Sequence, residues 1–404
     1  MSQRLVVWVA FALALFASLF ASPSWAQLEE ISQLKLSPQE TQRLQEVMNK
    51  PVDPGSLNST KISLLREKSD AARKLGDAVN EEKFLRELLP IGTDFHAKFA
   101  LRELLWQLGR REEAYQLGEA ITQEATWPPL AVTSRVELSF YYMQDQNLNK
   151  AEELISKAGE IIRNEFGRIS RQGMTPLYIA RGEMVFLMGK SELESRTGKW
   201  AASVESGKLA VEKSKDFSRL VNRIPNETEK SVGRQFILGV QAMLATRQAD
   251  AGLYSDAEWT FRELFKTAKE FGFNESMMPR FYNRLVDFYN TSGQFQEARN
   301  FSQKIEAILE AQNYGKDSRY WLGVQTRTNQ ALAGMDEWAQ LLQRLDAADA
   351  EKQIKEGSFQ MESQEKLRGL AYLKGQRYPQ AIKVLTAELE SHVASFGDAH
   401  FYTA

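Results

Sequence analysis

Gly252-Leu253-Tyr254-Ser255-Asp256-Ala257 decides the fold of this chain, because its pattern returns in Gly293-Gln294-Phe295-Gln296-Glu297-Ala298. Each stretch has a glycine, then an aromatic residue two places later and an alanine five places later. Glycine readily adopts the left-handed backbone conformation in which many helices end. Apolar residues spaced three and four apart flank both stretches, as in amphipathic helices. Each stretch therefore predicts a tight turn between two helices.

Weaker copies of this pattern recur along the chain. They place turns at residues 76, 109, 146, 198, 252, 293, 334 and 375, which are separated by 33, 37, 52, 54, 41, 41 and 41 residues. The three equal intervals predict regular 41-residue repeats from about residue 240. The two longest intervals predict longer helices or loops around Met174–Gly198 and Asp216–Gly233. In two copies Arg111 and Asp336 replace the aromatic residue, and Ala339 is the small residue of the copy at Gly334.

Each copy also predicts a second helix before the next turn. Met278 to Asn290 is one example, with Phe281, Leu285 and Phe288 on one face and Pro279 at the helix start. A single hairpin of two such helices cannot bury both apolar faces, so neighbouring hairpins must stack. The low proline content, 11 residues in 404, fits a chain made of helices.

The pattern resembles the tetratricopeptide repeat (TPR). One repeat matches that family at five places and the last repeat at four, and the residues that define these repeats are Gly252, Tyr254, Ala257, Leu285, Tyr289, Gly293, Phe295, Ala298, Gly369, Tyr372, Tyr378 and Ala381. The closing residues 395–404 are similar to the inter-repeat loop of the kinesin-light-chain subtype. The resemblance implies an all-α fold, a right-handed α-solenoid of about eight antiparallel helix-turn-helix repeats over residues 57–404.

Residues 1–26 have the pattern of a secretory signal peptide. Arg4 precedes an apolar run from Leu5 to Ala21, and Ser24-Trp25-Ala26 fits a peptidase cleavage site. We expect a mature chain that begins at Gln27 and is exported to the periplasm or secreted by a bacterium, without membrane attachment after cleavage. The alternative is an uncleaved membrane anchor, because the apolar run is close to the length of a spanning helix.

Residues 27–56 form a leader between this segment and the repeats. Ser37-Pro38-Gln39-Glu40 predicts the start of one short helix, with an N-cap serine and a capping-box glutamate. Pro51-Val52-Asp53-Pro54-Gly55-Ser56 then predicts a linker. The leader helix could cap the first end of the solenoid.

Composition and motifs argue against several classes of function. The chain has 51 Lys and Arg against 53 Asp and Glu, whereas binding of nucleic acid needs a clustered basic excess. Cysteine is absent, and none of the three histidines (His96, His392 and His400) has a metal-ligand partner at helical spacing. Six residues separate Gly182 from Gly189, where a phosphate loop needs four. We therefore expect no catalytic residue, no metal and no cofactor.

The resemblance implies a function in protein binding. In that family the first helices of the repeats line a concave groove that holds an extended peptide or a partner helix. Asn283, Asp287 and Asn290 fall at groove-facing positions, where polar groups could bond a peptide backbone; alternatively, they form only a solvated face. Five tryptophans are expected in the core, namely Trp106, Trp200, Trp259, Trp321 and Trp338. The partner and the oligomeric state stay open.

A second hypothesis concerns the end of the chain. Tyr402-Thr403-Ala404 falls where the first helix of a further repeat is expected. Bacterial proteins with repeats of the light-chain type often continue into a caspase-like peptidase domain. The chain could therefore be the regulatory TPR region of a larger enzyme instead of a non-enzymatic scaffold.

Overall fold

The computed structural model describes residues 38–91, 95–169, 175–274, 278–311, 319–351 and 364–396. These residues form an all-α fold of 17 α-helices and one short 3-10 helix, Leu89–Ile91. The α-helices are α3 (Pro38–Asn49), α4 (Asn58–Leu75), α5 (Ala78–Leu88), α6 (Phe95–Gln107), α7 (Arg111–Glu124), α8 (Pro128–Gln144), α9 (Leu148–Glu165), α10 (Thr175–Arg196), α11 (Trp200–Val221), α12 (Glu227–Asp250), α13 (Tyr254–Glu270), α14 (Pro279–Thr291), α15 (Phe295–Ala311), α16 (Arg319–Gly334), α17 (Trp338–Glu351), α18 (Glu365–Lys374) and α19 (Tyr378–Phe396). The predicted signal peptide and the closing residues 397–404 lie outside the described residues.

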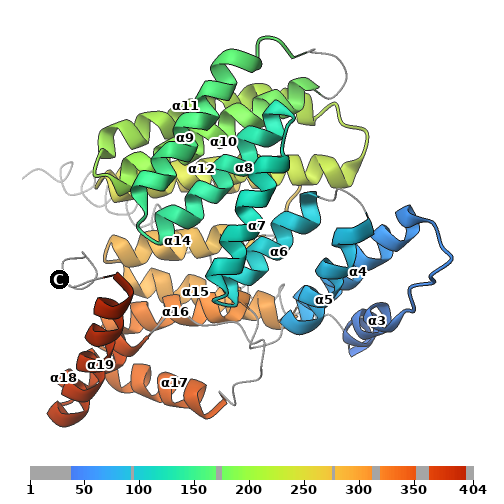
Figure 1. The fold of residues 1–404 in the computed structure, drawn as a ribbon. Helices are drawn as coiled ribbons and strands as arrows, with labels where there is room; N and C mark the ends of the chain where they lie inside the picture. Colours follow the sequence, from blue (N-terminus) through green and yellow to red (C-terminus); the bar gives the residue numbers. More distant parts are fainter. Residues whose placement is uncertain are drawn as a thin grey trace, which may run out of the picture.

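The helices from α4 onward form eight hairpins, each made of two helices consecutive in the chain. The first is α4–α5 and the last is α18–α19, and successive hairpins stack along the molecule (Figure 1). Helix α3 lies in the leader segment and packs against α4. None of the described helices is long and apolar enough to cross a membrane.

The eight turns inside the hairpins share one backbone geometry. In each, one residue has a φ between 57° and 76°; these residues are Gly76, Gly109, Gln146, Gly198, Gly252, Gly293, Asp336 and Gln376. At the fifth turn the N–H of Leu253 donates to the carbonyl of Gln248 at 2.8 Å, and that of Gly252 donates to Ala249 at 2.9 Å. The same pair of bonds closes the other seven turns. This is the Schellman ending of a helix, in which the left-handed residue satisfies the last carbonyls.

The structure corrects the predicted register of the last two turns. Gly334 lies at the end of α16, and the left-handed residue is Asp336, two places later. Consequently Trp338, not Asp336, occupies the aromatic place of that repeat. In the last turn the left-handed residue is Gln376 instead of Gly375. The sequence pattern placed both turns at a glycine, whereas the backbone uses a polar residue two places later in one turn and one place later in the other.

Five places after each left-handed residue lies a side chain that is at most 2% exposed. These side chains are Glu81, Ala114, Ala151, Ser203, Ala257, Ala298, Leu341 and Ala381. A small residue here lets the two helices of a hairpin cross closely. In the fourth hairpin Ser203 and Ser191 each donate a hydroxyl proton to the other's backbone carbonyl, at 2.7 and 2.8 Å. Leu341 occupies this place in the seventh hairpin, and the predicted Ala339 is exposed.

Long helices account for the two long sequence intervals. Helices α10 and α11 have 22 residues each and α12 has 24, against 13 in α6 and α14. At a rise of 1.5 Å a residue, α10 is about 13 Å longer than α6. The core consists of successive clusters along the stack, from one around Leu65 and Phe84 to one around Leu341 and Ala371.

The expectation of five core tryptophans is partly wrong. Trp321 is buried, but Trp259 is 64% exposed and Trp200 is 45% exposed. Trp106 is half-buried and lines a cavity. Spacing along a helix distinguishes one face from another but does not show which of several faces a neighbouring repeat covers.

Candidate functional site

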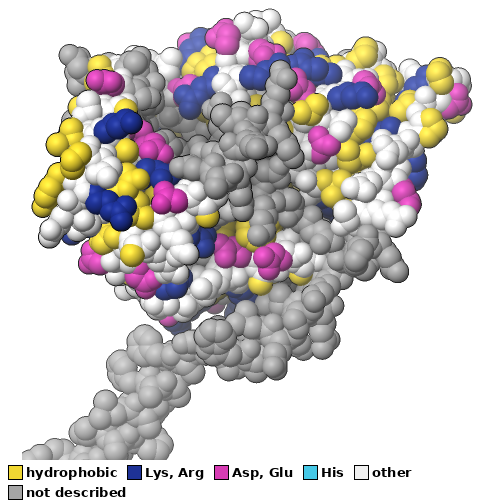
Figure 2. All heavy atoms as spheres, turned by 90° about the horizontal axis from the view of Figure 1, so that it is seen from below, with side chains coloured by type: hydrophobic (Ala, Val, Ile, Leu, Met, Phe, Trp, Pro, Cys, Tyr) yellow, Lys and Arg dark blue, Asp and Glu magenta, His cyan; other side chains and the backbone are white. Residues whose placement is uncertain are grey.

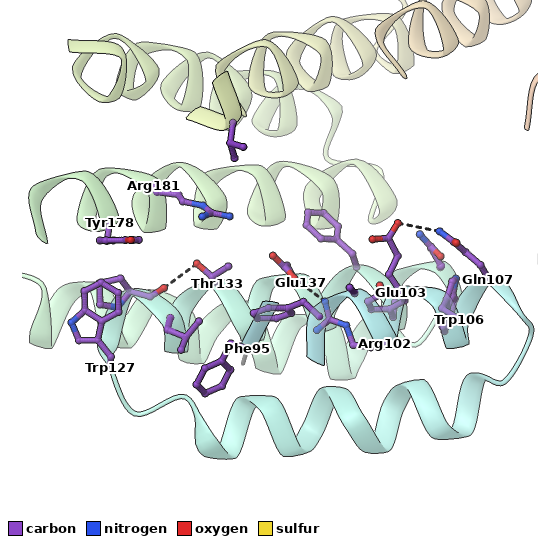
Figure 3. A pocket seen from close by; sticks show the side chains of 18 of the residues that line it. Phe95, Arg102, Glu103, Trp106, Gln107, Trp127, Thr133, Glu137, Tyr178 and Arg181 are labelled. Atoms are coloured by element: carbon purple, nitrogen blue, oxygen red, sulfur yellow. Dashed lines mark hydrogen bonds and ion pairs between the residues drawn. The ribbon is translucent and has the colours of Figure 1, made fainter. Parts of the chain in front are cut away.

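A cavity of about 860 Å³ lies on the face formed by the first helices of the hairpins (Figure 3). Its lining comes mainly from α6 and α8, with two side chains of α10 and one each from α4 and α12. Five successive hairpins therefore contribute to a single hollow. Such a surface exists only because the hairpins stack in order, with every first helix on the same side.

Aromatic side chains dominate the part of the lining that comes from α6 and α8. Phe95, Phe99 and Trp106 recur along α6, and Phe140 and Tyr141 lie near the end of α8. The ring centroids of Trp106 and Tyr141 are 4.7 Å apart in an edge-to-face arrangement. Burial raises the pKa of the Tyr141 hydroxyl above its usual range. This wall is a rigid, largely apolar contact surface.

A buried arginine lies in the middle of this wall. Arg102 of α6 is only 2% exposed, and its guanidinium lies between the rings of Phe99 and Tyr141, 4.9 and 4.8 Å from their centroids. Its Nη2 donates to Glu137 of α8 at 2.7 Å. Nε and Nη1 have no hydrogen-bond partner among the described residues. The Arg102–Glu137 pair joins two successive first helices and fixes the spacing between them.

The opposite edge of the cavity is more exposed. Trp127 and Tyr178 are each 39% exposed, and their rings meet edge to face at 5.0 Å. They lie at the start of α8 and near the start of α10, and Val232 lies near the start of α12. Arg181, one turn further along α10, is also exposed, and Figure 3 shows it across the cavity from Glu137. We call Trp127, Tyr178, Arg181 and Val232 the lip.

The three residues predicted to line a groove lie on α14, away from this cavity. Asp287 accepts two bonds from Arg327 of α16, from Nε at 2.7 Å and from Nη2 at 3.0 Å. The Nδ2 of Asn290 donates to the carbonyl of Arg327 at 3.2 Å. Thus two of the three predicted residues hold the first helices of neighbouring hairpins together. The Oδ1 atoms of Asn283 and Asn290 are buried and have no hydrogen-bond partner among the described residues.

A second ionic contact links the first helices α10 and α12. Arg247 of α12, which is 8% exposed, pairs with Glu192 of α10 at 2.9 Å and with Asp250 at 3.0 Å. Burial alone would raise the pKa of the Glu192 carboxyl, but Arg247 and Arg196 hold it below its usual range. The face of the first helices therefore has an aromatic part, over α6 to α10, and a charged part, over α10 to α16.

Sequence reasoning missed the aromatic part. Phe95, Phe99 and Trp106 recur at intervals of four and seven residues, which also fits a core stripe. A usable signal was present, because Arg102 interrupts this apolar stripe and core faces rarely carry a charge.

No model of a known protein family matches the sequence, and no curated protein is significantly similar to it. Several solved structures are similar in fold. A signal-transduction ATPase of the STAND class with a TPR sensor, from Pyrococcus horikoshii, is 16% identical with a TM-score of 0.43; the match covers 90% of this chain and 53% of that one. The chain thus spans about half the length of that protein.

Two further solved structures are similar to the chain. A TPR protein from Parabacteroides merdae is 14% identical over 78% of this chain and 99% of its own, with a TM-score of 0.37. The apo form of RapI is 10% identical over 84% of this chain and 87% of its own, with a TM-score of 0.42. These likenesses concern the fold alone. By its own pairwise helices and repeated turns, the described part of the chain is a TPR-like helical-repeat fold.

Proposed function

We propose that the chain is a non-enzymatic scaffold that binds an extended peptide or a helix of another protein. The observation that carries this proposal is the cavity that five successive hairpins line together. A hollow that crosses several stacked first helices fits a chain segment that lies across the repeats. The exposed rings of Trp127 and Tyr178 offer the kind of large, rigid contact area that dominates protein interfaces.

The side chains of the lip indicate which side chains a partner would present to the cavity. Trp127, Tyr178 and Val232 would contact apolar side chains of the partner. Arg181 packs against the ring of Phe236, 5.5 Å from its centroid, and forms no ion pair with another described residue. Its charge favours a partner with an acidic side chain close to the apolar ones.

A peptide array tests this proposal directly. Peptides that bind the wild-type chain should lose at least tenfold in affinity with Trp127→Ala or Tyr178→Ala, and acidic peptides should lose most with Arg181→Glu. Trp259→Ala is the matched control, since Trp259 is exposed on α13 and does not line the cavity. Equal binding by the lip variants and the control would rule out the cavity as the binding site.

Variants of the predicted groove residues on α14 can be tested in the same peptide array. Asn283 and Asn290 are half-buried and their Oδ1 atoms are buried, so a peptide backbone would have to bond their Nδ2 groups, while Arg327 already holds Asp287. Asn283→Ala and Asn290→Ala should therefore weaken binding of many peptides to a similar degree. If both variants bind the peptides as tightly as the wild type does, the binding site is limited to the aromatic part of the face.

We also propose that the chain is exported, and that its last repeats are of the kinesin-light-chain subtype. The signal pattern in residues 1–26 supports the first statement and the similarity of residues 395–404 supports the second. N-terminal sequencing of the chain purified from a bacterial periplasm should start at Gln27. A chain that retains Met1 would be an anchored or intracellular protein instead.

A further inference from the structure

Helix α19, the last of the described helices, exposes a stripe of large apolar side chains. Tyr378, Ile382, Leu389 and Val393 are 54%, 66%, 49% and 38% exposed. Tyr378, Ile382 and Leu389, with Leu385, border a hollow of about 430 Å³ to which Leu373 of α18 also contributes. Figure 2 shows apolar side chains gathered along the left edge of the molecule, the side on which α18 and α19 lie in Figure 1.

Earlier second helices take part in the contacts between successive hairpins. Helices α9, α11 and α15 each pack against the first helix of their own hairpin and against the first helix of the next one. At the other end of the stack, α3 packs on α4. Among the described residues, α18 is the only helix that packs extensively on α19. The stripe therefore continues a series of helix–helix contacts and is suited to one more helix.

The stripe has the same spacing when it is read from either end. The six positions Tyr378, Ile382, Leu385, Thr386, Leu389 and Val393 are separated by 4, 3, 1, 3 and 4 residues. At 100° a residue, all six project within an arc of about 100°. An antiparallel copy of the helix would thus meet the stripe with apolar side chains opposite apolar ones. A twofold contact requires such a self-complementary surface.

The charges beside the stripe have the matching arrangement. Lys383 and Glu390 are both exposed and lie on the same flank, on opposite sides of the centre of the stripe. A twofold axis near Leu385 and Thr386 brings Lys383 of one copy next to Glu390 of the other. A parallel arrangement would instead place this flank of the two copies on opposite sides of the contact, so Lys383 of one copy would not meet Glu390 of the other.

We propose that α19 is a dimerisation helix, which pairs antiparallel with α19 of a second copy of this chain. The pairing covers the stripe on both copies and extends the stack of hairpins across the twofold axis. It leaves the aromatic cavity of each copy free, because α6 and α8 lie in other hairpins. This proposal does not depend on the proposed function, and either can fail without the other.

Analytical ultracentrifugation of the full chain tests the pairing. The wild type should be a dimer at tens of micromolar, whereas Ile382→Glu and Leu389→Glu should raise the dissociation constant at least tenfold. Gln380→Glu adds the same charge to an exposed place on the opposite face of α19 and should leave the dimer intact. Circular dichroism must show the same helix content in all variants. A monomeric wild type, or equal effects of Ile382→Glu and Gln380→Glu, would overturn the proposal.

Charge exchange and cross-linking test the direction of the helices. Lys383→Glu should weaken the dimer, and the double variant Lys383→Glu with Glu390→Lys should restore it. Because the chain has no cysteine, Thr386→Cys provides a single thiol close to the twofold axis. Oxidation should convert this variant to a covalent dimer much faster than Gln380→Cys. Equal cross-linking of the two variants, or no restoration by the double variant, would rule out the antiparallel pairing.

Discussion

Ala298 belongs to the series of buried side chains at the helix crossings. It is 0% exposed and follows the left-handed Gly293 by five places. Ala298→Leu should lower the free energy of unfolding by about 1–3 kcal/mol, because three more carbon atoms must fit into a close helix contact. Urea denaturation measures this change. Gln303→Leu, at an exposed position of the same helix, is the control and should change stability little; equal effects would mean that the crossing is not tightly packed.

Tyr289 couples stability to alkaline pH. Burial, with the nearby Glu258, raises the pKa of its hydroxyl to about 12, whereas a tyrosine in an unfolded chain titrates near 10. Between about pH 10 and pH 12 the unfolded chain releases this proton and the folded chain keeps it, so stability falls as the pH rises. Below pH 10 the contribution is complete. The free energy of unfolding of Tyr289→Phe should therefore fall less steeply above pH 10. The difference in slope from the wild type should correspond to at most one proton released on unfolding.

Denaturation of the wild type and Tyr289→Phe in urea at several pH values from 7 to 12 checks this expectation. The two proteins should differ little in the pH dependence of stability below pH 9 and diverge above pH 10. Parallel curves up to pH 12 would show that the hydroxyl titrates alike in the folded and unfolded chains.

At the scale of the element, the hairpin turns allow a prediction that depends on the corrected register. Gln376 has a φ of 57°, which strains a residue with a side chain, whereas Gly375 has a φ of −80°. Gln376→Gly should therefore stabilise the chain by about 0.5–1 kcal/mol. Gly375→Ala should be nearly neutral, and Gly252→Ala, at a left-handed position, should destabilise. Thermal unfolding of the three variants distinguishes this register from a turn centred on Gly375.

The turns also show how much of the fold the sequence reveals. Six of the eight left-handed residues fall where the pattern placed them; five of them are glycines, which adopt this conformation at little cost, and the sixth is Gln146. Asp336 and Gln376 were missed because the pattern was centred on Gly334 and Gly375, although Gly375 stands three places before Tyr378 instead of two and Gly334 has no aromatic residue two places later. The left-handed conformation costs these residues about 1 kcal/mol. Packing of the flanking helices outweighs this cost, and such packing cannot be predicted from the local sequence.

The candidate site was less predictable than the turns. The positions of Asn283, Asp287 and Asn290 were inferred from a family resemblance, and whether they bind a partner stays a prediction. Their contacts with Arg327 could not be foreseen, because that residue lies in another hairpin. The aromatic cavity depends in the same way on the placement of five hairpins. Sequence periodicity describes a single helix, whereas a cavity depends on how helices from different repeats are arranged.

At the scale of the whole molecule, each hairpin contacts mainly its neighbours, so stability should be local. Gly369 of α18 offers a test, since a Cβ there would lie 2.4 Å from Cδ2 of Leu385. Gly369→Ala should increase amide hydrogen exchange in α18 and α19 and leave α8 and α9 unchanged. Mass spectrometry of exchanged peptides resolves the two regions. Faster exchange throughout the chain would show that the stack unfolds as one cooperative unit.

The stacking of hairpins from consecutive segments also has a kinetic consequence. Every helix finds its partners within the adjacent hairpins, so the fold requires few contacts between residues distant in sequence. Chains of low contact order form quickly, because little loop entropy is lost before contacts form. A polypeptide that emerges gradually, from the ribosome or from an export channel, can therefore complete one hairpin after another. Such a chain exposes only its most recent hairpin at any time, which limits its opportunity to aggregate during synthesis.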